Sequence, residues 1–297
     1  MKAKVLVSLA VLILVLPALA LAGGSASTAC KTKYPIVLAH GMFASAKIIG
    51  LVDYWWGIPD ALEDEGASVY ITSVNAMDGT VNKAKSFKTQ FLQILAVTGK
   101  AKANIIGHSH GTVYTRYAIT NLGLGTKVAS LTSLSGPHKG SALGDILAYG
   151  IPGPIQALAG SVIDWLYVFV MGDTDPNFTQ NCFDVTRDYM TKTFNPNTPN
   201  VAGVYYQSWA AKVKWSTPSI VLEPLWLIML AYEGANDGIV GVESAKWGNY
   251  RGEQAAAWYS PGVDHMGMVG HLFGLTPGFN APAFYVSIVK DLKARSL

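Results

Sequence analysis

The chain has little charge and almost no cysteine. Only 14% of its 297 residues are Asp, Glu, Lys or Arg, and the net charge is +3. Half of the residues are apolar, which excludes intrinsic disorder because disordered chains have few apolar residues and a high net charge. No cluster of basic residues occurs, so we expect no nucleic-acid partner. The two cysteines, Cys30 and Cys182, are too few for a disulfide scaffold or a cysteine-rich zinc site.

The N-terminal segment 1–22 has the features of a secretory signal peptide. Two lysines precede the uncharged apolar run 5–22, which ends in the small-x-small triplet Ala-Leu-Ala. We therefore expect cleavage after Ala22 and a secreted protein in which residues 23–297 form a single domain. The alternative is a permanent anchor, because an apolar run of this length is just able to span a bilayer. Export would also allow the two cysteines to form a disulfide.

Short apolar runs alternate with longer segments of helical spacing. We predict strands at residues 34–39, 69–74, 103–106 and 128–134. Helical spacing occurs at residues 81–97, and residues 281–295 form a closing amphipathic helix. Strands that alternate with helices predict an α/β fold in which a mostly parallel sheet is flanked by helices on both faces.

Residues 141–200 interrupt this alternation. Within them, residues 146–171 are almost wholly apolar, with Asp164 as the only charged side chain. Glycines and prolines divide the segment, so we expect helical pieces inserted between two strands of the sheet. Two interpretations stay open: ordinary core helices, or a mobile apolar lid over a binding site.

The segment 107–111, GHSHG, fits the G-x-S-x-G pattern of a nucleophile elbow. The pattern alone is weak, but here it follows the predicted strand 103–106 and precedes the helical pattern 112–121. That strand–turn–helix setting is the one the elbow requires, and its glycines allow a tight turn. We predict that Ser109 is a nucleophile at the carboxyl edge of the sheet; the alternative is a serine in a surface turn.

A serine hydroxyl needs a base, and in hydrolases with this elbow the chain order is Ser, acid, His. Among the histidines after Ser109, His110 is its direct neighbour and His138 precedes the apolar insertion. His265 and His271 remain. We favour His265 because it lies in a loop bounded by glycines, whereas the apolar residues that follow His271 indicate a packing role.

The acid that orients the histidine must lie between the two. Asp264 is adjacent to the histidine, and neighbouring side chains diverge. We favour Asp237, which lies in the turn after the strand-like apolar run 225–232; Glu233 and Glu243 are the alternatives. An Asn-Asp-Gly turn without any catalytic role is also common, so this assignment depends on the serine and the histidine.

An ester hydrolase also needs backbone N–H groups that stabilise the developing oxyanion. One is supplied by the residue after the nucleophile, here His110. The other comes from the loop after an early strand, and in the segment 40–43 we expect it to be the N–H of Met42.

Five segments together resemble the secreted bacterial true lipases of the Pseudomonas and Burkholderia type, which are α/β hydrolases. They are YPIVLAHGM (34–42), NIIGHSHG (104–111), PHKGS (137–141), ANDGIV (235–240) and DHMG (264–267). They occur in the order of that family and extend over most of the chain. The combination is much more specific than G-x-S-x-G alone.

The resemblance implies an α/β-hydrolase fold with a helical lid or cap insertion at about residues 141–200. It implies Ser109 as nucleophile, Asp237 as acid and His265 as base, with Met42 and His110 as oxyanion donors. The family cleaves long-chain acylglycerols at oil–water interfaces, and many members need a membrane-bound foldase. A lipid ester substrate, a lipid interface and a lipase-specific foldase are therefore the implied partners.

The chain departs from the family at two places. The family binds a structural calcium through two aspartates, one of them two residues after the catalytic histidine, where this chain has Gly267. Glu223 corresponds loosely to the other ligand. Because Ca²⁺ needs six to eight oxygens with anionic help, we expect this site to be lost. The family's cysteine shortly before the histidine is also missing, so Cys182 is free or paired with Cys30.

We therefore predict a serine-dependent carboxylic ester hydrolase, a triacylglycerol lipase, with no organic cofactor. An esterase or polyester depolymerase with the same triad is the alternative among enzymes. From another class, the alternative is a non-catalytic, membrane-associated binding protein on a hydrolase fold.

Overall fold

The computed structural model describes residues 27–42, 47–48, 52–150, 177–271 and 273–297. The predicted signal peptide and most of the apolar run 146–171 lie outside these residues. In the described part of the chain, no helix has both the length and the apolar character needed to span a membrane.

Six parallel strands form the central sheet, in the order β4-β1-β5-β6-β7-β8. They are β1 (Ile36–Ala39), β4 (Val69–Thr72), β5 (Ala103–His108), β6 (Val128–Leu134), β7 (Tyr205–Ala211) and β8 (Asn249–Gln254). The chain first leaves β1 toward β4 and then returns to β5 on the other side of β1. The connections after β1 and β5 therefore run in opposite directions along the sheet edge, and α/β sheets bind ligands at the crevice that such a reversal creates.

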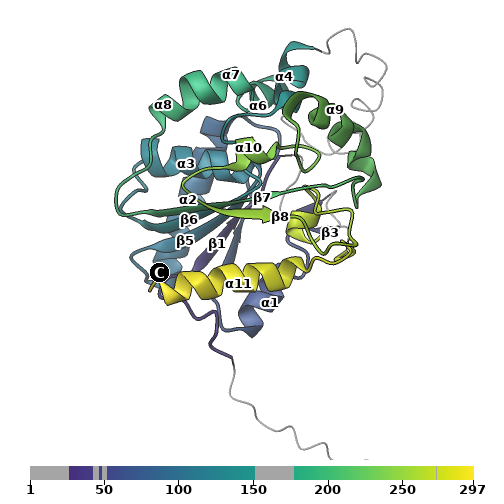
Figure 1. The fold of residues 1–297 in the computed structure, drawn as a ribbon. Coiled ribbons are helices and arrows are strands. Elements are labelled where there is room, and N and C mark those ends of the chain that lie inside the picture. The colour runs from purple at the N-terminus through teal and green to yellow at the C-terminus, as the bar shows by residue number, and fades with distance from the viewer. Residues whose placement is uncertain (1–26, 43–46, 49–51, 151–176, 272) are drawn as a thin grey trace, which may run out of the picture.

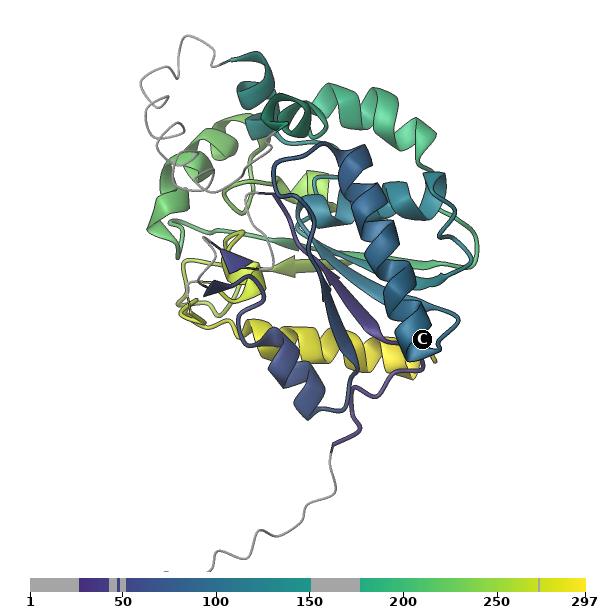
Figure 2. The same ribbon diagram turned by 180° about the vertical axis from the view of Figure 1, so that it is seen from behind.

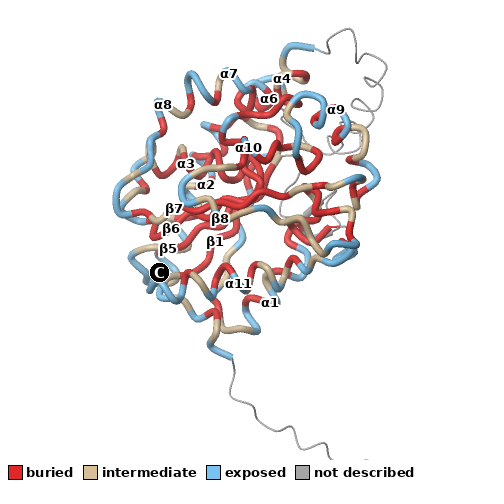
Figure 3. The backbone as a smooth tube through the Cα atoms, viewed as in Figure 1, coloured by how far each residue is buried: buried red, intermediate tan, exposed pale blue. Residues whose placement is uncertain are grey.

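Helices cover both faces of the sheet (Figures 1 and 2). Because side chains alternate along a strand, Ile36 and Leu38 of β1 face one layer and Val37 and Ala39 face the other. The first layer contains α1 (Ile58–Asp64) and α11 (Ala281–Ala294), and the second contains α2 (Thr80–Thr98) and α3 (His110–Asn121). Strands β1, β5 and β6 are buried along their whole length, as the red tube in Figure 3 shows.

A group of helices lies beyond the carboxyl ends of the strands, at the top of Figure 1. It comprises α4 (Ala142–Tyr149), α6 (Phe178–Phe183), α7 (Arg187–Tyr189), the π-helical turn η2 (Met190–Phe194), α8 (Asn195–Asn197) and α9 (Glu223–Glu233). Smaller elements are the antiparallel pair β2 (Lys47–Ile48) and β3 (Val52–Asp53), α10 (Val242–Ala245), and the 3₁₀ turns η3 (Ile220–Leu222) and η4 (Gly267–Val269).

The structure confirms the predicted α/β class, the four predicted strands and the helices predicted at 81–97, 112–121 and 281–295, with bounds that differ by a few residues. The strand-like interpretation of residues 225–232 is wrong, because they belong to the helix α9. Its buried residues Leu225, Ile228 and Met229 have helical spacing, whereas Leu227 and Leu230 are exposed.

The sequence analysis missed β7 and β8. Strand β7 is buried but includes the polar residues Gln207 and Ser208, which interrupt its apolar pattern. Strand β8 is at the edge of the sheet and alternates between exposed and half-buried residues. Edge strands in natural proteins carry polar and charged residues, which removes the apolar signal.

Candidate active site

Ser109 lies in a sharp turn between β5 and α3. Its φ of 56° and ψ of −133° are in a region that residues with a Cβ rarely adopt. Such conformations persist where the surrounding structure enforces them, which occurs mostly at functional sites. The Ser109 N–H donates to the Leu134 carbonyl of β6 at 2.9 Å, which fixes the turn to the end of the sheet.

Three glycines allow the backbone to pack closely around this serine. A Cβ on Gly111 would lie 2.1 Å from the Ala39 carbonyl oxygen, and one on Gly107 would lie 3.0 Å from the Thr112 nitrogen. On Gly41, a Cβ would lie 2.7 Å from the Ser109 Cβ. The loop after β1 therefore passes directly beside the serine, as an oxyanion loop must.

Asp237 and His265 form a buried hydrogen-bonded pair. His265 Nδ1 donates to Asp237 Oδ2 at 2.8 Å, and the His265 backbone N–H donates to the Asp237 carbonyl at the same distance. The other oxygen, Oδ1, accepts from the backbone N–H groups of Ile239 and Val240 at 3.0 and 2.7 Å. The carboxylate is thus held as an acceptor, which keeps the proton on Nδ1 and leaves Nε2 free to accept one.

The His265 ring lies beside the elbow. Its centroid is 4.4 Å from that of His108, the residue before Ser109. Within the described residues, no hydrogen bond joins Ser109 Oγ to this ring. In enzymes without bound substrate this contact is often long and shortens in the substrate complex.

The loop after β1 is held by a buried hydrogen-bond network. The Tyr54 hydroxyl accepts from the Gly41 N–H at 3.0 Å and donates to His108 Nδ1 at 2.5 Å. The Tyr114 hydroxyl donates to the His40 carbonyl at 3.0 Å. Tyr54 therefore connects the loop that carries Met42 with His108, the last residue of β5.

Replacing Tyr54 with phenylalanine is expected to lower kcat roughly tenfold. The change leaves the Gly41 N–H and the His108 ring without their buried partner, and each such loss is worth about 1–3 kcal/mol. Tyr285→Phe is the matched control, because that hydroxyl is buried and has no hydrogen-bond partner among the described residues. Ester hydrolysis by both variants measures the effect; equal kcat values would contradict the role of Tyr54.

His110 is held on the opposite side by residues that the sequence analysis missed. Its Nε2 donates to Thr80 Oγ1 at 2.7 Å, and its Nδ1 accepts from the buried Lys83 ammonium at 3.1 Å. Lys83 also donates to Asn181 of α6 at 3.3 Å, so it connects α2, α6 and the elbow. The available signal was the four-residue spacing of Lys83 and Phe87, which places a lysine on the buried face of α2.

The buried histidines of this region are held neutral. Burial lowers the pKa of His40 to about 4. It also lowers the pKa values of His108, His110 and His138 well below the usual range. His40 uses both ring nitrogens, since Nδ1 donates to the Gly41 carbonyl at 2.9 Å and Nε2 accepts from the Val74 N–H at 3.0 Å.

The protein is expected to lose stability as the pH falls from about 6.5 to about 4. In this window an unfolded chain binds a proton at His40 that the folded chain excludes, so unfolding becomes more favourable as the pH falls. The lowered pKa of His40 corresponds to a loss of about 3 kcal/mol in the free energy of unfolding at the acid end of this pH range. Urea denaturation at pH 7 and at pH 4.5 measures it, and His40→Gln should reduce the difference. Equal free energies of unfolding at both pH values would contradict this account.

An apolar cavity opens beside Ser109. Met42, Ser109 and His110 line it together with side chains from α4, the turn before it, α6 and the loop after Asp237. The remaining lining residues, including Val185 from the turn after α6, are Pro137, Ser141, Leu143, Gly144, Leu147, Cys182, Val185, Ile239 and Val240. The cavity suits an apolar acyl chain whose ester group lies at the serine.

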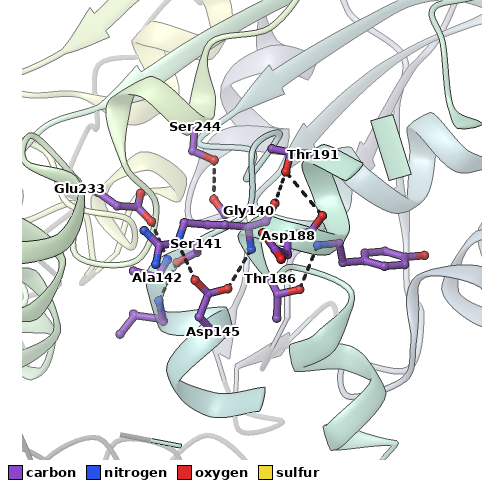
Figure 4. Close-up of polar contacts among 12 residues, drawn as sticks. Gly140, Ser141, Ala142, Asp145, Thr186, Asp188, Thr191, Glu233 and Ser244 are labelled. Atoms are coloured by element: carbon purple, nitrogen blue, oxygen red, sulfur yellow. Dashed lines mark hydrogen bonds and ion pairs between the residues drawn. The ribbon is translucent and has the colours of Figure 1, made fainter. Parts of the chain in front are cut away.

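The start of α4 is joined to the loop that carries the acid. Figure 4 shows Ser141 and Ala142 beside Glu233. Ser141 caps α4 by accepting from the Leu143 N–H, and it donates to the Ile239 carbonyl at 2.6 Å. Glu233 accepts from the Ala142 N–H at 2.5 Å. These hydrogen bonds therefore join the start of α4, which lines the cavity, to the segment that carries Asp237.

The alternative residues lie elsewhere in the structure. Glu233 caps α4, and Glu243 pairs with Lys246 at the surface. His271 Nε2 donates to the Asp53 carbonyl at 2.9 Å. None of them contacts Asp237 or His265 through a hydrogen bond among the described residues.

The residues at the positions of the family's calcium ligands do not fit the ion. Gly267 offers no side chain, and its N–H donates to Asp264 Oδ1 at 2.7 Å. Glu223 Oε2 already accepts from the Thr217 N–H at 2.6 Å and from the Ser216 hydroxyl at 3.1 Å. The carboxylate oxygens that a cation would need as ligands thus already accept hydrogen bonds from N–H and O–H groups. No group of three or more His, Cys, Asp or Glu in the described ranges is arranged to hold a metal.

Both cysteines are free and buried. Cys30 lies in the core beside α11, where its thiol contacts the Val286 carbonyl, and Cys182 lines the cavity at Ser109. Burial raises the pKa of the Cys182 thiol to about 12, so the thiol stays protonated at neutral pH.

Comparison with known proteins places this geometry among hydrolases. The profile of the alpha/beta hydrolase fold family matches residues 34–162. A triacylglycerol lipase of Vibrio cholerae is 34% identical over 242 residues, which cover 73% of this chain and 75% of the relative. A triacylglycerol lipase of Pseudomonas fragi is 27% identical over 296 residues, and this alignment covers 90% of this chain and 98% of the relative.

Solved structures give the same fold. The mature form of a Bacillus licheniformis lipase superposes with a TM-score of 0.65 at 17% identity, covering 88% of this chain and 93% of that one.

Proposed function

This chain belongs to the bacterial triacylglycerol lipases of the α/β-hydrolase superfamily, and from that premise we propose that it hydrolyses long-chain acylglycerols through an acyl-enzyme on Ser109. The observation that carries the proposal is the strained Ser109 turn beside the buried Asp237–His265 pair. Ser109 lines the apolar cavity, and so do Ile239 and Val240 of the loop that carries Asp237.

In the first step Ser109 Oγ attacks the ester carbonyl carbon. His265 Nε2 takes the hydroxyl proton as the new C–O bond forms, and Asp237 stabilises the resulting imidazolium through Nδ1. His265 then gives this proton to the leaving alcohol oxygen as the old ester bond breaks. The products of this step are a free alcohol and an ester between the fatty acid and Ser109.

The negative charge of the tetrahedral intermediate needs donors that are already in place. We assign this role to the backbone N–H groups of Met42 and His110, two residues that line the cavity with Ser109. Tyr54 and Lys83 support the two loops from opposite sides. Each such donor is worth about 3–4 kcal/mol of the barrier.

In the second step water replaces the serine. His265 Nε2 takes one proton from the water, whose oxygen attacks the acyl carbon. The bond to Ser109 Oγ breaks, His265 returns the proton to that oxygen, and the fatty acid leaves. The enzyme is restored without any cofactor.

The proposal extends to the part of the chain that precedes the described residues. The charged start, apolar run and small-x-small triplet of residues 1–22 support export and cleavage. The apolar run 146–171 supports a lid that exposes the cavity at a lipid surface, and a foldase is proposed as a maturation partner on the family resemblance alone.

The chain length of the preferred acyl group distinguishes a lipase from an esterase with the same triad. We expect turnover of p-nitrophenyl esters from two to sixteen carbons to rise toward the long chains, and turnover of emulsified triacylglycerol to exceed that of the dissolved short-chain ester. Activity confined to the shortest esters would favour the esterase. No activity together with no labelling by an organophosphonate, in protein shown to be folded, would favour the non-catalytic binding protein.

A further inference from the structure

Three loops meet where the acid and the base lie. One follows β7 and includes residues 212–222, the second carries Asp237, and the third carries His265. Backbone hydrogen bonds join them in pairs: Lys214 N–H donates to the Pro261 carbonyl at 2.6 Å, and His265 N–H donates to the Asp237 carbonyl at 2.8 Å. The position of His265 therefore depends on how these loops are held together.

Asp264, the residue before His265, joins two of these loops through its side chain. Its Oδ2 accepts from the Ser219 N–H at 2.6 Å, and its Oδ1 accepts from the Gly267 N–H at 2.7 Å. The side chain is fully buried. One carboxylate thus bridges the loop after β7 and the turn that follows the histidine.

Only a carboxylate suits this position. Both partners are N–H donors, so both side-chain oxygens must accept, whereas an asparagine would present its NH₂ group to one of the donors. A Cβ on Gly267 would lie 3.2 Å from Asp264 Oδ1 and 2.7 Å from Thr276 Oγ1. The glycine therefore leaves room for the close approach of the carboxylate.

Glu223 supports the same loop from its other end. It is the first residue of α9, and its Oε2 accepts from the Thr217 N–H and the Ser216 hydroxyl. The Thr217 hydroxyl donates to the Ser219 carbonyl at 2.8 Å, which holds the residue whose N–H binds Asp264 from its other side. Unlike Asp264, Glu223 uses a single oxygen for all of its described hydrogen bonds.

We propose that Asp264 is a positioning residue that holds His265 in place through a metal-free carboxylate clamp, with Glu223 as its support. The proposal deepens the function proposed above and rests on it. The clamp includes Gly267 and Glu223, the two positions that correspond to the family's calcium ligands, and the carboxylate oxygens there already accept from N–H and O–H groups. We therefore expect catalysis and folding to be independent of calcium.

Asp264→Asn tests the clamp, because it keeps the shape and removes one acceptor. We expect kcat to fall roughly 10- to 100-fold with little change in KM, since a small displacement of a catalytic group has effects of this size. The melting temperature should fall by about 2–8 °C. Activity is compared at a temperature where circular dichroism shows both proteins to be folded, so a loss of kcat there reports the position of His265.

Asp188→Asn is the control, since it makes the same chemical change at an exposed carboxylate that pairs with Lys192 and lies outside the clamp. We expect its kcat and melting temperature to stay close to those of the unchanged protein. For the unchanged protein, excess EDTA followed by dialysis into calcium should leave kcat and melting temperature unchanged.

Two results would overturn the clamp: a melting temperature that falls with EDTA and returns with calcium, or an Asp264→Asn variant with unchanged kcat. If the unchanged protein hydrolyses no ester, the proposed function fails instead. The melting temperatures of the two variants, with and without EDTA, then still decide whether Asp264 acts as a metal-free clamp.

Discussion

Replacing Ser109 with alanine is expected to lower kcat for ester hydrolysis by a factor on the order of 10⁴ to 10⁶. The acyl-enzyme cannot form without Oγ, and water has to attack the ester directly with only the remaining polarising groups. The overall fold is expected to persist, because alanine is smaller than serine and the change removes only one hydroxyl group. Initial rates with a long-chain p-nitrophenyl ester measure the effect.

Ser135→Ala is the matched control for this experiment. Ser135 is also fully buried and also has a positive φ, 49°, and its hydroxyl has no partner in the described part of the chain. It lies after β6 and has no part in the proposed reaction. We expect this variant to keep its activity and to bind an organophosphonate covalently, whereas Ser109→Ala should do neither. Phosphonate on another residue of the Ser109→Ala variant would contradict the assignment.

Replacing Asp237 with asparagine is expected to lower kcat about 10⁴-fold. An asparagine oxygen can still accept from the Val240 N–H, but its NH₂ group then faces His265 Nδ1. The ring responds by accepting at Nδ1, which places its proton on Nε2, and this nitrogen can no longer take the proton of Ser109. KM should change much less than kcat, because the cavity lining is untouched.

Two glutamates provide the comparison for Asp237. Glu243→Gln removes an exposed charge that pairs with Lys246, and we expect little change in kcat. Glu233→Gln retains an oxygen that can accept from the Ala142 N–H, so its effect should also be small. If either glutamine variant lost activity to the extent expected for Asp237→Asn, while Asp237→Asn stayed active, the acid would have to be reassigned.

The elbow was predictable because its signals are local. An apolar strand, two glycines around a serine and a helical pattern occupy residues 103–121, and steric limits on the backbone determine the turn that such a sequence forms. The same holds for α2 and α11, whose apolar spacing is regular. The α9 segment was misread because a short apolar run does not by itself distinguish a strand from a buried helix.

The support of the site was not predictable from local pattern. Tyr54 precedes His108 by 54 positions, and Asp264 follows Ser219 by 45. Nothing in the surrounding sequence marks either contact, because each depends on how separate loops pack at the end of the sheet. The sequence shows that Lys83 interrupts the apolar face of α2, but it does not show which residues the lysine binds.

The sequence alone determined the strand–turn–helix at Ser109, the order of serine, acid and histidine candidates, and the α/β class, because backbone sterics and apolar periodicity act over short distances. It favoured Asp237 as the acid and kept Glu233 and Glu243 as alternatives. The tertiary structure decided that Asp237 contacts the His265 ring while the adjacent Asp264 faces away toward Ser219 and Gly267. Neighbouring side chains diverge, which separates Asp264 from the His265 ring. The partners of the two carboxylates are then determined by which distant loops fold onto the same edge of the sheet.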